Sequence, residues 1–123
     1  MDTINFNLTI NDEGQILLPP EVVKHFDDEI YICPDRKCLR LIAKKQVEES
    51  IKRNKEFARK FGCFVLSSTI FLCIINENKI TLSHDLRKYI LPNNENELIL
   101  ILDGEKGFLC EKDCTQHVLK YYF

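Results

Sequence analysis

NFNLTINDEGQILLPP, residues 5–20, contains two short apolar runs joined by a polar turn. In the first run apolar side chains alternate with polar ones, as in a strand with one buried face, at Phe6, Leu8 and Ile10. Residues 11–14 favour a turn, and residues 15–18 return as a second strand. The prolines at 19–20 stop that strand because they lack an amide hydrogen, and they suit the first turn of a helix. The pattern predicts a hairpin followed by a short helix.

A second hairpin and a long helix are predicted next. The apolar-rich runs 29–33 and 38–42 flank the polar segment 34–37, which favours a turn. Residues 44–61 predict an amphipathic helix, because apolar side chains recur at helical spacing at Val47, Ile51, Ala58 and Phe61. Residues 44–60 hold seven basic and three acidic side chains. We interpret this charge as a solvated helix face in preference to a direct nucleic-acid contact.

The same order of elements begins again after the long helix, at an offset of 64 residues. The apolar positions of the first strand are matched by Ile70, Leu72 and Ile74. Residues 76–78 predict a turn and residues 79–82 a strand. Ser83 can cap a short helix, which Pro92 prevents from continuing. A second hairpin follows over residues 97–110.

We therefore predict one domain over residues 1–123, containing repeat 5–42 and repeat 69–111 linked by the helix 44–61. Each repeat is too small to close a core alone. The two should pack together into one barrel-like body with quasi-twofold symmetry. The expected fold class is mainly β with short helices.

Length and charge limit the functions that this chain can have. With 123 residues, a multidomain enzyme is excluded. The net charge of -2 gives no global positive field, so any nucleic-acid surface must be local. We find neither a secretory signal nor a stretch long enough to span a membrane, which favours a cytoplasmic protein whose six cysteines are reduced thiols.

Metal and catalytic sites find little support in the sequence. Cys110, Cys114 and His117 could bind a soft metal together with Cys33 or Cys38, but no two cysteines form a C-x2-C pair. We therefore favour ordinary thiols. No nucleophile–base signature or phosphate-cradling glycine loop accompanies the three histidines. We expect no catalytic residue, metal, cofactor or small-molecule substrate.

The segment 14–19, Gly-Gln-Ile-Leu-Leu-Pro, with the helix and hairpin after it, resembles the AbrB-type swapped-hairpin DNA-binding proteins. Two tandem copies are similar to the MraZ family, in which two AbrB units are fused in one chain. The resemblance covers residues 6–111. It implies a double-split, swapped-hairpin β-barrel and a bacterial transcription regulator whose promoter elements lie near cell-division and cell-wall genes. It also implies binding to repeated promoter elements in double-stranded DNA, a ring-like homo-oligomer and association with the nucleoid.

The resemblance also implies which residues contact DNA. The family pattern Asp-x-x-Gly-Arg places an arginine at the strand start, and that position is occupied here by Gln15 and Lys79. Lysine is a point charge, whereas glutamine can pair with adenine bidentately. Acidic Asp12 and Glu13 beside Gln15 repel phosphates, so the second repeat is the stronger surface. The predicted DNA-binding residues are Gln15, Lys24, Lys79, Arg87 and Lys88.

Two other functions fit the same fold. Because the family arginine is replaced twice, the chain could be an oligomeric assembly or partner-binding module that does not bind DNA. An antitoxin-like role is a third interpretation, although AbrB-type antitoxins carry a long extended tail and about a dozen residues follow the last predicted strand here. The apolar segment 118–123 is expected to dock on the chain's own core or on a neighbouring subunit, and we favour the subunit contact slightly.

Overall fold

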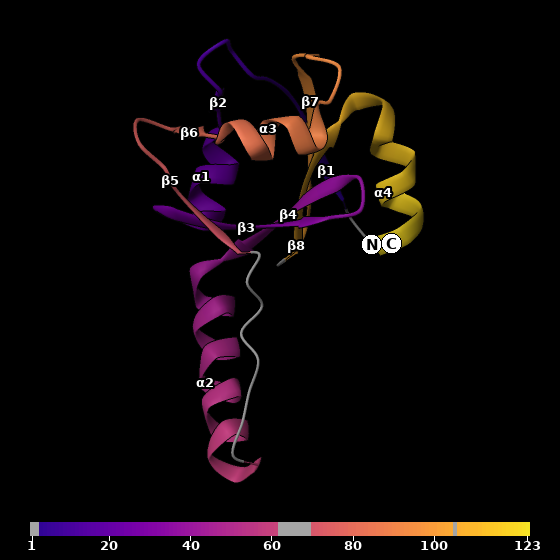
Figure 1. Cartoon of the computed structure of the whole chain (residues 1–123). Helices are drawn as coiled ribbons and strands as arrows, with labels where there is room; N and C mark the ends of the chain where they lie inside the picture. Colours follow the sequence, from indigo (N-terminus) through magenta and orange to yellow (C-terminus); the bar gives the residue numbers. More distant parts are fainter. Residues whose placement is uncertain (1–2, 62–69, 105) are drawn as a thin grey trace.

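The computed structural model describes residues 3–61, 70–104 and 106–123, with backbone alone for residues 50, 51, 54, 55, 57–59 and 61. The first half contains β1 (Ile4–Thr9), β2 (Gln15–Leu17), α1 (Pro20–Phe26), β3 (Glu29–Asp35), β4 (Cys38–Ala43) and α2 (Lys44–Phe61). The second half contains β5 (Phe71–Ile74), β6 (Lys79–Thr81), α3 (His84–Ile90), β7 (Glu97–Asp103), β8 (Lys106–Glu111), η1 (Lys112–Cys114) and α4 (Thr115–Tyr122) (Figure 1).

The strands form an antiparallel six-stranded sheet and a separate two-stranded ribbon. The sheet has the order β1-β7-β8-β4-β3-β5, and the ribbon pairs β2 with β6. The first strand of each half joins the hairpin of the other half, because β1 pairs with β7 and β5 pairs with β3. The strand order is unchanged when the halves are exchanged. The pairing therefore has a pseudo-twofold axis.

Two residue pairs mark this axis. In the ribbon, Ile16 lies opposite Ile80, its equivalent at an offset of 64. In the sheet, Arg40 lies opposite Phe108, its equivalent in the other hairpin. Ile16 and Ile80 are buried and face the core, whereas Arg40 is exposed on the far face of the sheet. The outer face of the ribbon and the surface around Arg40 therefore lie at opposite poles of the axis.

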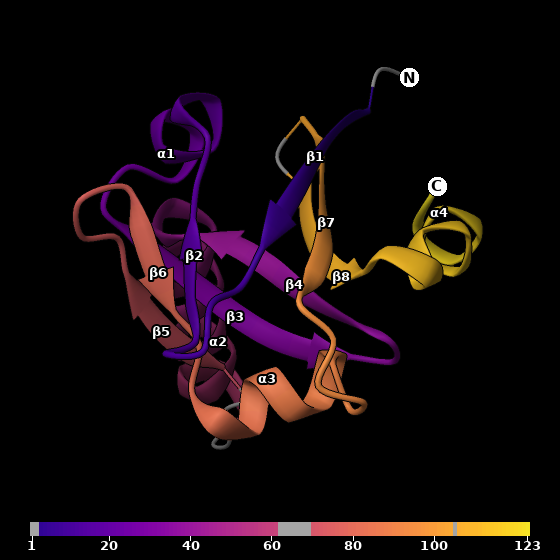
Figure 2. The same cartoon turned by 90° about the horizontal axis from the view of Figure 1, so that it is seen from above.

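The expected class, mainly β with short helices, is confirmed, but the described strands do not close into a barrel. The sheet ends at β1 on one side and β5 on the other. No continuous ladder leads from the sheet into the ribbon among the described residues, because each edge is joined to it by one isolated bridge, Ile10 to Ile16 on the β1 side and Asn76 to Lys79 on the β5 side. Figure 2 shows the ribbon between α1 and α3, above the crossing strands of the sheet.

The main core fills the space between the ribbon, the short helices and the inner face of the sheet. The two short helices contribute equivalent buried pairs, Val22 with Phe26 and Leu86 with Ile90. Ser83 caps α3 as expected, since its side chain accepts a hydrogen bond from the amide of Leu86 at 3.3 Å. Burial of these apolar side chains is the main force that holds the ribbon on the sheet.

A second cluster covers the outer face of β7 and β8. Val118 of α4 is fully buried there with residues that include Ile99, Ile101 and Phe108. The ring of Tyr122 lies 4.5 Å from the ring of Phe108. The preference for a subunit contact of segment 118–123 is wrong, because α4 docks on the chain's own sheet. Both faces of β7 are apolar, so the side chains on its outer face must also be shielded from water, and α4 does this.

The inward face of β5 differs from the expectation. Cys73 is buried, whereas Leu72 is 50% and Ile74 is 64% exposed. Cys73 is the structural equivalent of Leu8, because they pair with the equivalent residues Ile30 and Leu98. Equivalent residues of β1 and β5 are therefore 65 positions apart in the sequence, one more than the expected 64.

A shorter turn explains the shift. The amide of Asn11 donates to the carbonyl of Gln15, while the amide of Asn76 donates to the carbonyl of Lys79. The second turn thus has one residue fewer than the first. A one-residue slip moves every side chain of a strand to the other face.

The hairpin turn of β3 and β4 is also shorter than expected. Pro34 lies within β3, opposite Leu39, and the turn consists of Arg36 and Lys37. The pairing of β3 with β5 stops at Ile32. Pro34, which has no amide hydrogen to donate, lies beyond the paired part of this edge and interrupts no hydrogen bond with β5.

Helix α2 extends away from the rest of the molecule (Figure 1). Of the predicted apolar stripe, Val47 is buried, while the side chains of Ile51, Ala58 and Phe61 lie outside the described residues. Lys52 is exposed, as a solvated charged face requires. None of the helices in the described part of the chain has the length and apolar character needed to cross a membrane.

Candidate nucleic-acid interface

The β2–β6 ribbon is built by two symmetric backbone hydrogen bonds. The amide of Leu18 donates to the carbonyl of Asn78 at 2.7 Å, and the amide of Leu82 donates to that of Gly14 at 2.9 Å. Gly14 has φ of 80°, and a Cβ there would lie 2.9 Å from the Leu82 carbonyl oxygen. Asn78 takes φ of 64° in the equivalent position. Asparagine tolerates this left-handed conformation better than most residues, so the turn expected at residues 76–78 forms without a glycine.

Four side chains form the outward face of the ribbon. Gln15 lies opposite Thr81, and Leu17 lies opposite Lys79. Thr81 and Lys79 are exposed, Gln15 is half-buried and Leu17 is 62% exposed. None of the four is acidic. Because Gln15 and Lys79 are related by the pseudo-axis, the structure brings the two predicted base-contacting residues together on one surface.

A hollow of about 370 Å³ runs beside this ribbon. Gln15, Leu17 and Lys79 line it together with Asn11 and Asn96. All five side chains are uncharged or basic. The hollow therefore offers hydrogen-bonding groups and one positive charge to a ligand that lies along the ribbon.

The side chain of Gln15 is held in place by Asn11. The Asn11 Oδ1 accepts hydrogen bonds from the amides of Glu13 at 3.0 Å and Gln15 at 2.9 Å. The Asn11 Nδ2 donates to the Gln15 Oε1 at 3.1 Å. This contact leaves the Gln15 amide nitrogen directed away from Asn11, so the side chain is preorganised before any ligand binds.

The remaining predicted residues lie on the short helices that flank the ribbon. Lys24 on α1 and Lys88 on α3 are equivalent at the ribbon offset of 64, and both are exposed. Arg87 is half-buried, and its Nη1 donates to the carbonyl of Asp12 at 3.3 Å. Arg87 therefore ties the first turn to α3. This turn-holding contact was not visible in the sequence, because it joins residues 75 positions apart.

A second hollow, of about 300 Å³, gathers Arg87, Lys88 and His84 with Asp12. Asp12 and Glu13 are exposed beside the ribbon, as expected from their sequence position. Within this hollow two basic side chains, Arg87 and Lys88, meet one carboxylate, Asp12, which therefore lies against α3 of the second repeat. Helix α3 carries a further exposed acid, Asp85.

Sequence reasoning missed Leu17 and Thr81 as members of this face. The register that places them beside Lys79 and Gln15 requires β2 to pair with β6, which the sequence did not specify. The polar–apolar–polar pattern of residues 79–81 is a sequence signal that could have found Thr81, whereas residues 15–17 hold no such pattern that would place Leu17 outward.

The cysteines lie elsewhere and form no common metal site in the part of the chain that the structure describes. Among these residues, the one set of three ligands within 4.8 Å is Glu95, Glu111 and Asp113, and a hydrogen bond with Glu95 raises the pKa of Glu111. The described cysteines are free thiols, and Cys63 lies outside the described residues. Burial raises the pKa of Cys38 to about 11 and that of Cys110 to about 12. These thiols are therefore protonated at neutral pH.

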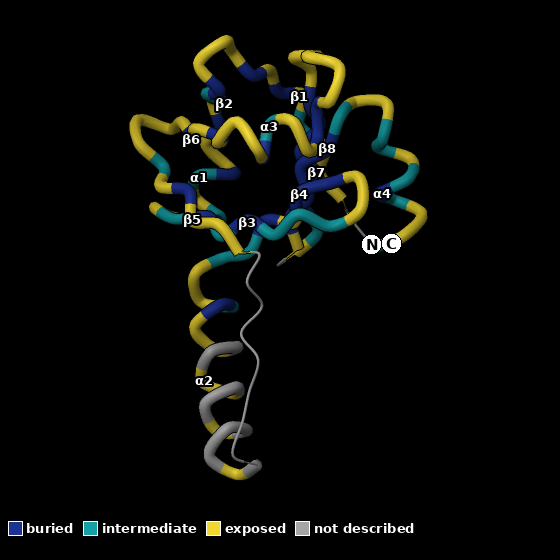
Figure 3. Tube along the Cα trace, in the orientation of Figure 1, coloured by how far each residue is buried: buried dark blue, intermediate teal, exposed yellow. Residues whose placement is uncertain are grey.

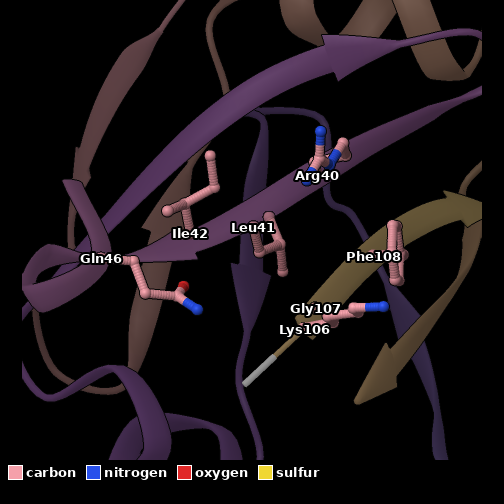
Figure 4. Close-up of a pocket in the computed structure, with 7 residues that line it drawn as sticks. All are labelled: Arg40, Leu41, Ile42, Gln46, Lys106, Gly107 and Phe108. Carbon is pink, nitrogen blue, oxygen red and sulfur yellow. The ribbon is translucent and has the colours of Figure 1, made fainter. Parts of the chain in front are cut away.

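A separate cleft of about 190 Å³ lies at the opposite pole, where β4 and β8 cease to pair (Figure 4). Arg40 and Lys106 line it with Gln46 and Phe108. The cleft shares no lining residue with the hollow beside the ribbon, so it is not part of the ribbon surface. Arg40 and Lys106 are positively charged but lie away from the ribbon, so substitutions at these two residues serve as controls for substitutions at the ribbon.

Comparison with protein-family models and with curated protein sequences finds no significant match to this chain.

Proposed function

We propose that this chain is a DNA-binding transcription regulator of the MraZ type, which binds repeated promoter elements through the outer face of the β2–β6 ribbon. Its fold in this proposal is the double-split, swapped-hairpin arrangement of two AbrB-like repeats. The exchange of β1 and β5 between the two hairpins supports this assignment.

One observation carries the proposal: the outward face of the ribbon presents Gln15 and Lys79 symmetrically about the pseudo-axis, without an acidic side chain among its four members. A two-stranded ribbon is narrow enough to enter the major groove of DNA. Lys24 and Lys88 flank the ribbon at equivalent positions, as a duplex with phosphates on both sides of the groove requires.

Each residue has a distinct role in this mechanism. Lys79 contacts a guanine edge or a phosphate, and Gln15, oriented by Asn11, donates and accepts hydrogen bonds at adenine. Lys24 and Lys88 neutralise phosphates. Arg87 is a positioning residue, because its guanidinium is already bonded to the turn that precedes Gln15.

An oligomer supports this function. Each chain offers few positively charged side chains at the ribbon interface, so several chains bound to repeated DNA elements would gain affinity through avidity. A ring-like homo-oligomer bound to the nucleoid in the cytoplasm meets that need. The mechanism requires no cofactor, and its chemistry contains no catalytic step.

Fluorescence anisotropy with short duplexes tests the proposal. Lys79→Glu places a negative charge on the outer face of the ribbon, so we expect duplex affinity to fall at least tenfold at low salt. Lys106→Glu makes the same charge change at the opposite pole and should leave affinity nearly unchanged. Equal effects of the two reversals would reject the ribbon as the DNA surface.

The second candidate is an assembly or partner-binding module that keeps this fold and does not bind DNA. The exposed acids Asp12 and Glu13 beside the ribbon favour it. The pair of substitutions Gln15→Arg and Lys79→Arg discriminates between the two functions. If the variant binds duplex DNA and the native chain does not at low salt, the assembly function is the correct one.

A further inference from the structure

The exposed hydrophobic side chains of the molecule concentrate on one edge of the sheet. Eight large hydrophobic side chains are exposed in the described part of the chain, and four of them lie within residues 70–74. Three point away from the buried Cys73, at Ile70 (41% exposed), Leu72 (50%) and Ile74 (64%). In Figure 3, β5 is largely yellow, whereas β7, which has a neighbour on each side, is dark blue.

The pseudo-symmetry supplies an internal comparison for this patch. Because Cys73 is equivalent to Leu8, the three outward positions of β5 correspond to those of β1. On β1 the same positions carry polar residues, Asn5, Asn7 and Thr9. The fold therefore accepts polar side chains at this place in the sheet. The aliphatic side chains of β5 need an explanation other than folding.

The edge also lacks the features that prevent strand pairing. β5 lies at the end of the sheet, with β3 as its single neighbour among the described strands. Residues 70–75 contain no charged residue and no proline, the usual means by which exposed edges avoid association. Glu29, opposite Ile74, lies 3.9 Å from Lys44 in an ion pair, and the exposed Asp28 lies beyond the strand, where its carbonyl accepts from the amide of Ile75. Residues 70–75 themselves bring no like charges together when two copies of this edge approach.

We propose that the β5 edge is an interface with a second copy of this chain, formed by antiparallel pairing of β5 with β5. The backbone groups of β5 that face away from β3, and have no strand partner among the described residues, supply the donors and acceptors for the second copy. The outward aliphatic side chains of both copies then pack side by side. The contact is isologous, so by itself it gives a dimer.

Grafting the β1 residues onto β5 tests the interface. The variant Ile70→Asn/Leu72→Asn/Ile74→Thr gives β5 the polar side chains that its equivalent strand already carries, so the fold should survive. We expect the native chain to sediment with at least twice the mass of one 14.5 kDa chain, and the grafted variant to raise the dissociation constant about a hundredfold or more. A matched variant, Ile4→Asn/Leu17→Asn, removes apolar surface elsewhere and should leave the mass unchanged.

Isotope-filtered NOE spectra of mixed labelled and unlabelled native chains test the contact without any substitution. Contacts between β5 of one copy and β5 of the other are expected. A native chain that remains monomeric at NMR concentrations, or intermolecular contacts confined to other strands, would overturn the proposal. The interface does not depend on DNA binding, because it lies outside the ribbon. Duplex anisotropy of the native chain therefore decides the proposed function separately from the mass measurement.

Discussion

The two lysines that flank the ribbon give a quantitative prediction for DNA binding. Lys24 and Lys88 occupy equivalent positions, and with Lys79 they are the exposed predicted cations of the interface. Arg87 is excluded from this count because it is bonded to the Asp12 carbonyl. Three phosphates neutralised per chain give a slope of about -2.7 for log affinity against log salt, and a loss of about 40-fold between 50 and 200 mM salt.

Replacement of two of these cations should change the slope by a defined amount. Lys24→Gln/Lys88→Gln leaves one cation, so the slope should fall to about -0.9 and the same salt change should cost about 3.5-fold in affinity. The assay is fluorescence anisotropy with one duplex across a series of salt concentrations.

A control variant with the same loss of net charge makes this test specific. Arg40→Gln/Lys106→Gln removes two positive charges at the opposite pole of the pseudo-axis, where the cleft of Figure 4 lies. Its slope should equal that of the native chain. The reasoning is refuted if the Lys24/Lys88 variant keeps the native slope, or if both double variants lower it equally.

Three further predictions concern stability. Ile80→Ala removes a buried side chain that faces the core beneath the ribbon, so urea unfolding should show a loss of about 2–5 kcal/mol, while Leu17→Ala on the exposed face should cost less than about 1 kcal/mol. Tyr122→Phe removes the 2.7 Å hydrogen bond from the tyrosine hydroxyl to Asp35 but keeps the ring, so thermal and urea unfolding should both show a loss of about 1 kcal/mol; no loss would show that this hydrogen bond does not help to hold α4 on the sheet. Burial raises the pKa of Cys110 to about 12, above its ordinary value of 9.0, so the folded chain holds this proton more tightly than the unfolded chain. Stability from this thiol is complete below pH 9 and is lost as the pH rises from 9 toward 12, and urea midpoints of the native chain and of Cys110→Ala should converge over that range.

The sequence predicted the elements that depend on local chemistry. Pro19 and Ser83 marked the starts of α1 and α3, because the backbone requirements of a first helical turn are met by a few residue types. A turn was expected at residues 76–78, and Asn78 takes the left-handed conformation that this turn requires. These features are decided within a few residues, so the pattern was sufficient.

The register of β5 could not be predicted in the same way. Residues 70–75 are apolar without interruption, so alternation cannot show which side chains face inward. The shorter turn at Asn76 then decides the face, through a hydrogen bond one residue nearer than in the first repeat. The consequence is large, because the aliphatic side chains assigned to the core lie on the surface.

Contacts between distant residues explain the other gaps in the candidate site. Arg87 was predicted to contact DNA, and its additional bond to the Asp12 carbonyl depends on the packing of α3 against the turn of the other repeat. The docking of α4 depends on the second apolar face of β7 and β8. Neither partner can be deduced from sequence spacing.

A titration of the isotope-labelled native chain with duplex DNA, followed by NMR, tests the ribbon assignment most directly. The account predicts that the largest chemical-shift changes fall on the backbone amides of Gln15, Leu17, Lys79 and Thr81. Changes that centre instead on Arg40 and Lys106, at the other end of the axis, would contradict it, as would a spectrum that duplex DNA leaves unaltered at low salt.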